Sequence, residues 1–234
     1  MYNQAKKNNV EAQNQLKSDC VKFYNKNGKG IRVMFAGNSI TIHDIKKEIG
    51  WLGEWGMAAS KKENDYVHIL MKKILQSDAD ASFCICHVSD WEKNYKSGHS
   101  LFDMYKNAKE FNADIVVARF VENCPIENFE GEVFKNEYEK FADYLCNSEK
   151  ASLIYTGGFW KHPGNVQIAD IAAERKVPFV ELSDLGEADD MKAIGLFSHN
   201  GVANHPGDKG MKTIADRIWN VLENTLQLIA EGEK

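Results

Sequence analysis

The sequence has few prolines and no long apolar run. Its 234 residues include four prolines, and no Pro-rich linker, low-complexity run or internal repeat divides the chain. No stretch approaches the roughly twenty apolar residues that a membrane-spanning helix needs. The N-terminal stretch MYNQAKKNNVEAQNQLKSD also lacks the apolar segment and the small-residue cleavage pattern of a secretory leader. These absences predict a soluble protein that resides in the cytoplasm and has no membrane span.

An excess of basic charge is missing as well. The chain has 29 Lys and Arg against 34 Asp and Glu, which gives a formal net charge of −5. Proteins that bind nucleic acid carry a basic patch or stripe, so nucleic acid is not an expected partner. The hydrophobic fraction of 43% is sufficient for a core, and 11% of the residues are aromatic. The composition therefore indicates a globular protein and does not indicate its oligomeric state.

The cysteines and histidines lack the spacing of a metal site. One residue separates Cys84 from Cys86, and no second pair completes a zinc site. No histidines are spaced as in His-x-x-x-His, so neither a metal nor another cofactor is expected. Free cysteine is most often buried, and buried thiols are predicted for Cys20, Cys84, Cys86, Cys124 and Cys146. Cys124 is considered as a nucleophile, but a cysteine directly after an apolar strand more often packs in the core.

Strand-like and helix-like segments alternate along the chain. Short apolar runs predict strands at 31–36, 81–88, 114–120, 152–155 and 178–182. Segments with helical spacing follow them, at about 60–75, 102–111, 133–147, 166–175 and from Lys209 onward. Parallel strands need crossover helices. The alternation therefore predicts an α/β fold with a five-stranded, mostly parallel sheet covered by helices on both faces.

The chain is expected to form one domain with an N-terminal extension. Residues 1–30 are polar, with weak helical spacing at Val10, Leu16 and Val21, and are predicted to form a helix packed on the domain edge. A turn-rich cluster at 25–30 ends this segment. Residues 31–234 form the domain itself. Within it, Ser60 to Glu63 has the pattern of a capping box, with Ser60 as the N-cap of the next helix.

Polar residues with catalytic potential follow the ends of the predicted strands. Ser39 follows the first strand, in a stretch whose residues also suit an ordinary tight turn. Asn123 follows the third strand, and His205 lies between the fifth strand and the last helix. In an open α/β sheet the carboxyl ends of the strands meet on one rim. A serine there becomes a nucleophile when a base takes its proton, and amide N–H groups can stabilise the oxyanion that forms.

Other polar residues lie at the same strand ends. Arg119 and Glu122 end and follow the third strand, and are predicted to form an ion pair under the site. Trp160 and His162 follow the fourth strand. A structural role is the expectation for the ion pair.

Three blocks of the sequence resemble the SGNH (GDSL-like) hydrolases. Gly37 to Thr41 resembles the block with the nucleophile, with Asn38 where Asp is commoner. Glu122–Asn123 resembles the block with an oxyanion donor. His205 to Met211 resembles the block with the base. The resemblance spans residues 31 to about 222. It implies a three-layer α/β/α sandwich of the flavodoxin-like type. It also implies that Ser39 is the nucleophile, His205 the general base, and Asn123 an oxyanion donor beside the Ser39 N–H.

The first departure from the family pattern concerns the residue that orients the base. The family usually has an Asp three residues before the histidine, and Val202 occupies that position. Asn200–Gly201 could be a displaced remnant of an Asp-Gly pair. Either an Asn, with Asn200 as the candidate, or a backbone carbonyl would then orient His205. Loss of the acid can cost orders of magnitude in rate, largely through the tautomer that it enforces.

The second departure concerns the oxyanion glycine after the second strand. The corresponding stretch, His87 to Glu92, contains no glycine. A backbone N–H of Ser89, Asp90 or Trp91 could serve instead, because any non-proline residue has one. Among these three, Asp90 is the preferred candidate.

Aromatic residues after strand ends suggest the kind of substrate. Asn38 and four tryptophans are candidates for binding it: Trp51, Trp55, Trp91 and Trp160. Aromatic walls suit sugar faces or acyl chains, and at least two of the tryptophans are expected to line the cleft. The resemblance implies a serine esterase that hydrolyses a small-molecule ester through an acyl-serine. A small acyl group on a carbohydrate is the preferred substrate, with a lysophospholipid or a thioester as alternatives.

Two other functions remain open at this point. A glycan-binding module that has lost catalysis would explain the missing acid, although Ser39, Asn123 and His205 are all present. A flavodoxin-like binder of flavin or nucleotide would need a phosphate cradle after the first strand. The stretch Gly37 to Thr41 lacks the Gly-x-x-x-x-Gly-Lys pattern, so this function is disfavoured.

Overall fold

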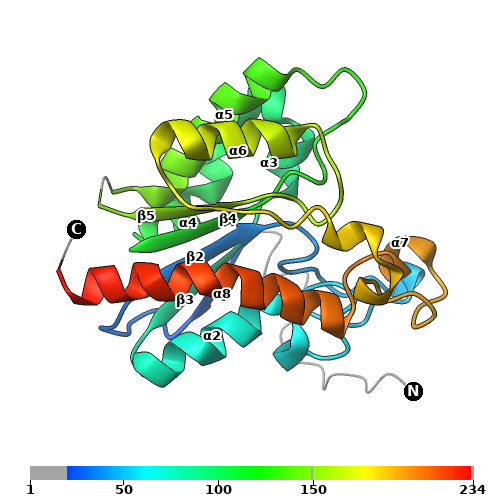
Figure 1. The fold of residues 1–234 in the computed structure, drawn as a ribbon, viewed down its shortest axis with the longest axis horizontal. Coiled ribbons are helices and arrows are strands. Elements are labelled where there is room, and N and C mark those ends of the chain that lie inside the picture. The colour runs from blue at the N-terminus through cyan, green and yellow to red at the C-terminus, as the bar shows by residue number, and fades with distance from the viewer. Residues whose placement is uncertain (1–19, 149, 233–234) are drawn as a thin grey trace.

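The computed structural model describes residues 20–148 and 150–232 and shows a six-stranded, mostly parallel sheet (Figure 1). The strand order is β1-β3-β2-β4-β5-β6. The strands are β1 (Val21–Tyr24), β2 (Arg32–Gly37), β3 (Ser82–His87), β4 (Ile115–Arg119), β5 (Ser152–Thr156) and β6 (Phe179–Val180). Strands β2 to β6 run parallel, and β1 pairs antiparallel with β3 at the edge. The predicted α/β class is confirmed, with one strand more than expected.

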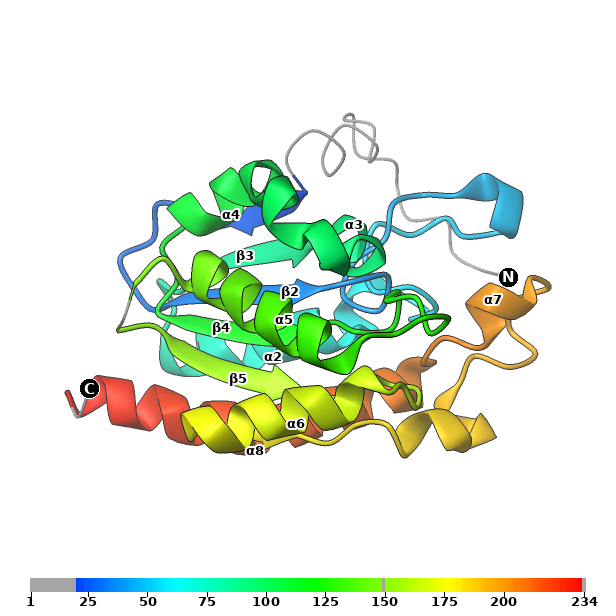
Figure 2. The same cartoon turned by 90° about the horizontal axis from the view of Figure 1, so that it is seen from above.

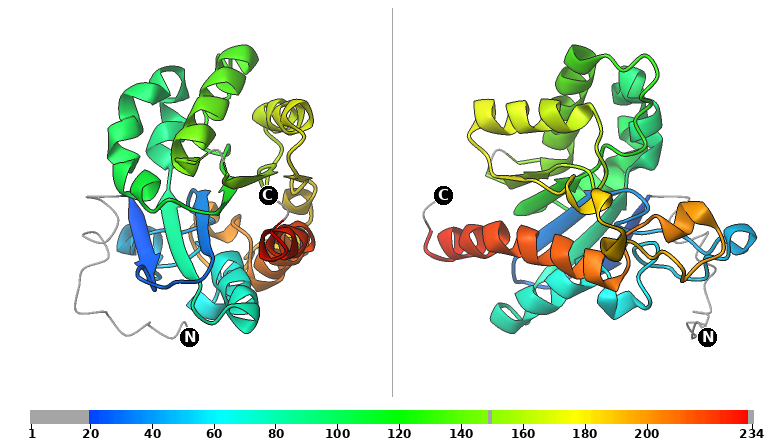
Figure 3. Two further views of the ribbon diagram at one scale, coloured as in Figure 1. Left: turned by 90° about the vertical axis from the view of Figure 1, so that its left-hand side faces the viewer. Right: turned by 45° about the vertical axis from the view of Figure 1, so that its right-hand side comes forward.

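Helices cover both faces of the sheet. One face carries α2 (Tyr66–Ser77) and the long C-terminal helix α8 (Asp208–Ala230); the other carries α3 (Ser89–Lys93), α4 (Lys106–Glu110), α5 (Gly131–Cys146) and α6 (Gly164–Arg175). Figure 3 shows these two helical layers on opposite sides of the sheet. The short helix α7 (Asn200–Ala203) lies beyond one end of the sheet (Figure 2). No helix of the described residues is both long and apolar enough to cross a bilayer.

The apolar runs of the central strands bury both of their faces. Val33 and Phe35 of β2 pack in the core cluster under α2 and α8, whereas Met34 and Ala36 pack in the cluster under α3 to α6. Side chains alternate between the two faces of a strand. A parallel strand with helices on both sides therefore reads as a continuous apolar run. This is why the central strands were visible in the sequence.

The N-terminal segment differs from its prediction. Residues 1–19, which include Val10 and Leu16, lie outside the described part of the chain. Val21 to Tyr24, predicted to be helical, form the edge strand β1 and pair in register with Cys86 to Phe83 of β3. The open edge of β3 offers these residues backbone hydrogen bonds that weak helical spacing cannot outweigh. The turn cluster after β1 is present, and Gly28 N–H donates to the Asn25 carbonyl at 2.8 Å.

The predicted capping box is also wrong. Asp65, not Ser60, caps α2, and its side chain accepts a hydrogen bond from the His68 N–H at 2.7 Å. Residues Lys62–Asn64 form a short 3-10 turn before the helix. Ser60 instead donates its hydroxyl to Asp208 at 2.6 Å. An Asp accepts a capping bond as well as a Ser does, and the 3-10 turn moves the start of α2 to it.

Candidate active site

Ser39 lies in a tight turn at the carboxyl end of β2. The N–H groups of Thr41 and Ile42 both donate to the Asn38 carbonyl, at 2.8 and 3.0 Å. Gly37 is required at the start of this turn, because a Cβ there would lie 2.8 Å from the Arg119 carbonyl oxygen and would overlap the Thr41 side chain. Asn38 is consequently buried, and Ser39 is partly exposed at the end of the sheet.

His205 lies within hydrogen-bond distance of Ser39, although 166 residues separate them. Its Nε2 is 2.8 Å from the Ser39 Oγ, and its Nδ1 is 2.6 Å from the carbonyl oxygen of Gly201 in α7. A carbonyl oxygen can only accept, so Nδ1 carries the proton and Nε2 presents its lone pair to the Ser39 hydroxyl. The ring of Trp160 contacts His205 edge-on at a centroid separation of 5.3 Å.

A backbone carbonyl therefore orients the imidazole. The expectation that the Asn200 side chain would do so is wrong, because that side chain is exposed and Nδ1 of His205 is bonded to Gly201. The single turn of α7 places the Gly201 carbonyl four residues before His205, with its oxygen directed at the ring. Val202, at the position where the family has its acid, is buried in the core.

The surroundings of His205 keep the ring neutral. Desolvation lowers the pKa of His205 to about 4, although the hydrogen bond to Gly201 acts in the opposite direction. The nearby His43 lowers the pKa further, and the charge of Glu122 raises it without reversing the shift. At neutral pH the imidazole is consequently available as a proton acceptor.

Asn123 lies in the same cavity as Ser39 and His205. This cavity has a volume of about 370 Å³ and is lined by residues that follow β2, β3 and β4 and by residues around α7. The side-chain N–H of Asn123 donates to Glu92 Oε2 at 2.7 Å, and the backbone N–H of Asn123 lies 3.4 Å from Glu92 Oε1. The three residues that were expected to act together are thus brought together.

A buried polar network supports the turn that carries Ser39. The amide of Asn38 donates to Glu92 Oε1 at 2.9 Å and to Glu122 Oε2 at 2.5 Å, and its Oδ1 accepts from Arg119 at 2.7 Å. Arg119 and Glu122 form the predicted ion pair, at 2.6 Å. Asn38 is 1% exposed, so its expected role in substrate binding is wrong. An Asp at position 38 would add a third carboxylate beside Glu92 and Glu122, which explains why an amide occupies this position.

The two carboxyl groups of this network differ in acidity. Burial and the neighbouring Glu122 raise the pKa of Glu92 to about 7. Burial acts in the same direction on Glu122, but the charge and hydrogen bond of Arg119 outweigh it and lower the pKa of Glu122. Glu92 was missed by the sequence analysis, since a single Glu in a short polar segment carries no signal of burial.

The expectation for the oxyanion donor after β3 also changed. Ser89, the first residue of α3, lines the cavity, whereas Asp90 is exposed and does not. Ser89 thus replaces Asp90 as the candidate for the third oxyanion donor. The preference for Asp90 failed because the sequence does not determine at which residue α3 begins.

Three of the four tryptophans belong to the core. Trp51 and Trp91 are fully buried and Trp55 is 6% exposed. Trp51 packs edge-on against Trp55, and Trp91 stacks on Phe141 at 4.8 Å. Their expected role as cleft walls is wrong, because each ring is covered by other core side chains. Trp160 alone of the four is partly exposed, beside His205.

The remaining lining residues carry positive or neutral side chains. His43, His87, His199 and Lys93 face the same cavity. Burial lowers the pKa of His43, and it lowers the pKa of His87 to about 4. The described residues contain no group of three or more His, Cys, Asp or Glu side chains arranged to hold a metal ion.

Cys124 is not a nucleophile in this structure. It is 3% exposed, and burial together with Glu92 and Glu122 raises the pKa of its thiol well above the usual value. A buried thiol with a raised pKa is unreactive. The expectation of buried cysteines is confirmed for all five, and Cys84, Cys86, Cys124 and Cys146 are free thiols.

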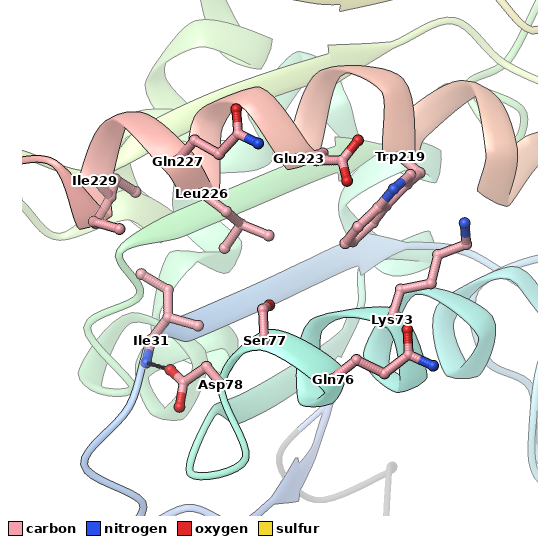
Figure 4. A pocket seen from close by; sticks show the side chains of 11 residues that line it. Ile31, Lys73, Gln76, Ser77, Asp78, Trp219, Glu223, Leu226, Gln227 and Ile229 are labelled. Carbon is pink, nitrogen blue, oxygen red and sulfur yellow. Dashed lines mark hydrogen bonds between the residues drawn. The ribbon is translucent and has the colours of Figure 1, made fainter.

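A larger cavity lies elsewhere and does not contain the catalytic pair. It measures about 550 Å³ between α2 and α8. Figure 4 shows Lys73 and Trp219 toward one end of this cavity and Ile31 toward the other, where the N–H of Ile31 donates to Asp78 at 2.6 Å. Ile31 precedes β2, whereas Ser39 follows it, so this cavity is at the other end of the strand.

No family model and no curated protein matches this chain. Solved structures do match. An esterase (EstA) from Pseudoalteromonas sp. aligns over 85% of this chain and 100% of its own, with a TM-score of 0.53 and 12% identity. A family two carbohydrate esterase from Cellvibrio japonicus aligns over 86% of this chain and 63% of its own, with a TM-score of 0.54 and 13% identity.

A third match is a two-domain esterase active on acetylated mannans. It aligns over 86% of this chain, with a TM-score of 0.53 and 17% identity, and this chain spans 52% of its length. The structural neighbours also include a protein of the G-D-S-L lipolytic class from Desulfitobacterium hafniense, with a TM-score of 0.50 and 16% identity. The chain has the fold of the SGNH (GDSL-like) hydrolases.

Proposed function

We propose that this protein is a serine esterase that hydrolyses carboxylic esters through an acyl-serine intermediate. One observation supports this most strongly: the Ser39 hydroxyl lies 2.8 Å from Nε2 of a histidine whose Nδ1 is engaged by a backbone carbonyl. This is the arrangement of a nucleophile and its general base, with the base held in the productive tautomer. Asn123 adds an amide donor to the same cavity.

The first half-reaction forms the acyl-serine. Ser39 Oγ attacks the ester carbonyl carbon while Nε2 of His205 accepts the hydroxyl proton. The oxyanion that develops is stabilised by the side-chain amide of Asn123 and by the backbone N–H groups of Ser39 and Ser89. When the intermediate collapses, the bond to the alcohol oxygen breaks, and His205 returns the proton to the leaving alcohol.

The second half-reaction releases the acid. A water molecule takes the place of the alcohol, His205 accepts one of its protons, and the hydroxide attacks the acyl carbonyl. Collapse of the second tetrahedral intermediate expels Ser39 Oγ, which regains its proton from His205. The Gly201 carbonyl holds the tautomer throughout but carries no full charge to stabilise the imidazolium. The rate is therefore expected to lie below that of an enzyme with a complete triad.

The proposed substrate is a small acyl ester of a carbohydrate, with acetate as the preferred acyl group. A cavity of about 370 Å³ with Ser39 in its lining suits a short acyl group. Trp160 is partly exposed beside His205 and offers an apolar ring to a sugar face. Among the structural neighbours, one is described as active on acetylated mannans and another as a carbohydrate esterase.

The test compares hydrolysis of p-nitrophenyl acetate, p-nitrophenyl butyrate and acetylated mannan by the wild type, Ser39→Ala and His205→Ala. We expect the wild type to hydrolyse the acetate faster than the butyrate and to release acetate from the mannan. Both variants should lose this activity while retaining the circular dichroism spectrum of the wild type. An inactive wild type, or full activity in Ser39→Ala, would refute the esterase and favour a glycan-binding module on the same fold.

A further inference from the structure

Glu92 is a buried carboxyl group with no cation of its own. It is 0% exposed, and within the described part of the chain it forms no ion pair. The nearby Arg119 pairs with Glu122 instead. Burial of a carboxyl group that lacks a positive partner destabilises a fold unless hydrogen bonds compensate. The hydrogen bonds of Glu92 come from amide groups of Asn38, which precedes the nucleophile, and of Asn123, the proposed oxyanion donor.

One of these bonds fixes the orientation of the Asn123 amide. The side-chain amide of Asn has an oxygen end and a nitrogen end, and only the nitrogen end can donate to an oxyanion. The three groups bonded to Glu92 are all N–H donors, so both of its carboxyl oxygens act as acceptors toward them. The contact at 2.7 Å between Asn123 Nδ2 and Glu92 Oε2 therefore keeps the nitrogen end in place. A flipped amide would bring two oxygen acceptors together.

The other oxygen of the same carboxyl group reaches the nucleophile turn. Glu92 Oε1 accepts from Nδ2 of Asn38 at 2.9 Å, and Asn38 directly precedes Ser39. One rigid side chain on α3 thus connects the residue before the nucleophile to the oxyanion donor, which comes from the end of β4. Catalytic groups must be held within a fraction of an ångström to be effective, and such supporting contacts provide this.

We propose that Glu92 is a positioning residue that fixes the orientation of the Asn123 amide for oxyanion stabilisation. This inference rests on the proposed esterase function, in which Asn123 is the donor. Glu92 itself does not line the cavity and touches no reacting atom. It acts through Asn123 and holds that side chain relative to the Ser39 turn.

The principal test is a double-mutant cycle between Glu92→Gln and Asn123→Ala, measured as kcat on p-nitrophenyl acetate. Gln has nearly the shape of Glu but carries an NH₂ group, which must oppose an N–H of Asn38 or of Asn123. Removing one oxyanion donor costs about 100- to 1,000-fold in kcat. We expect Glu92→Gln alone to lose about 10- to 100-fold of kcat, with KM nearly unchanged.

In the Asn123→Ala background Glu92→Gln should cause a much smaller loss, limited to its contact with Asn38, because the oxyanion donor through which Glu92 acts is absent. Residues that act as a unit show this non-additivity. A loss by the same factor in both backgrounds, or a wild-type kcat for Glu92→Gln, would overturn the inference. The matched control is Glu137→Gln: Glu137 is 6% exposed on α5 and is bonded to Lys140 at 2.8 Å, and its change should leave kcat at the wild-type value.

A second measurement separates failure of this inference from failure of the proposed function. The side-chain ¹⁵N–¹H signals of Asn123, assigned by their disappearance in Asn123→Ala, report the contact whether or not the protein is active. At a pH above the Glu92 pKa of about 7, a charge-assisted hydrogen bond to the carboxylate should shift one of the two protons downfield. Glu92→Gln should remove that shift and Glu137→Gln should not. An Asn123 signal that Glu92→Gln leaves unchanged would refute the positioning role, even in an active enzyme.

Discussion

Activity should persist at an acidity at which most histidine-dependent enzymes have lost it. The perturbation is pH, and the group concerned is His205, which must be neutral to accept the Ser39 proton. Desolvation lowers the pKa of its ring to about 4. The acid limb of kcat/KM reports the pKa of the essential base in the free enzyme. We therefore expect the limb that belongs to His205 to have its midpoint near pH 4, below a partial loss near pH 7 that accompanies protonation of Glu92.

The size of the effect follows from the two protonation equilibria. At about pH 5, a base with a pKa of about 4 is roughly 90% neutral, whereas a histidine with the ordinary pKa of about 6.5 is roughly 3% neutral. The active fraction at that pH is thus about 30-fold larger than for an unperturbed histidine. A difference of this size exceeds the error of a kinetic assay many times over.

The assay is kcat/KM for p-nitrophenyl acetate between about pH 3.5 and pH 8, followed at the isosbestic wavelength of the product. Circular dichroism at each pH excludes unfolding as the cause of the limb. Burial also lowers the pKa of His87 to about 4, so the profile is repeated with His87→Asn, in which the limb should keep its midpoint. Glu92→Gln, in which residue 92 does not titrate, isolates the limb of His205, and a midpoint near 6.5 in that folded variant would refute the argument from desolvation.

Three further predictions concern the network and the thiols. Asn38→Asp should lower the free energy of unfolding at neutral pH by about 3–5 kcal/mol, because it places a third carboxylate beside Glu92 and Glu122. Urea titration measures this, and an unchanged urea midpoint would contradict the network. Asn123→Ala should lower kcat by about 100- to 1,000-fold with little change in KM, and a change in KM alone would indicate substrate binding instead. Cys124 should react with a thiol reagent only after unfolding, since it is buried with a raised pKa; rapid labelling of the native protein at Cys124 would show otherwise.

The sequence was sufficient for the central strands and for the order of the functional residues. Buried parallel strands are apolar throughout and end in turn residues, so Val33 to Phe35 and the turn that carries Ser39 could be recognised. Because the carboxyl ends of parallel strands meet on one rim of the sheet, Ser39, Asn123 and His205 could be predicted to converge there. The edge strand Val21–Tyr24 could not be predicted, because it depends on the free edge of β3 and not on its own pattern.

The supporting contacts of the site were beyond the reach of the sequence. Every residue has a carbonyl, so nothing marks that of Gly201 as the partner of His205. A Glu is usually exposed, so nothing marks Glu92 as buried. The tryptophans illustrate the opposite error: a large ring in an irregular segment suggests a binding surface, yet Trp51 and Trp91 are fully buried because their large apolar area stabilises the core.

The most direct test of the esterase proposal is labelling with a serine-reactive phosphonate, read by mass spectrometry of the peptide that contains Ser39. Only a serine activated by a base reacts with such a reagent at an appreciable rate. The proposal predicts one covalent adduct per chain, located at Ser39, and its absence in His205→Ala, which removes the base 2.8 Å away. A wild-type protein that remains unlabelled, or labelling that is equally fast in His205→Ala, would contradict it.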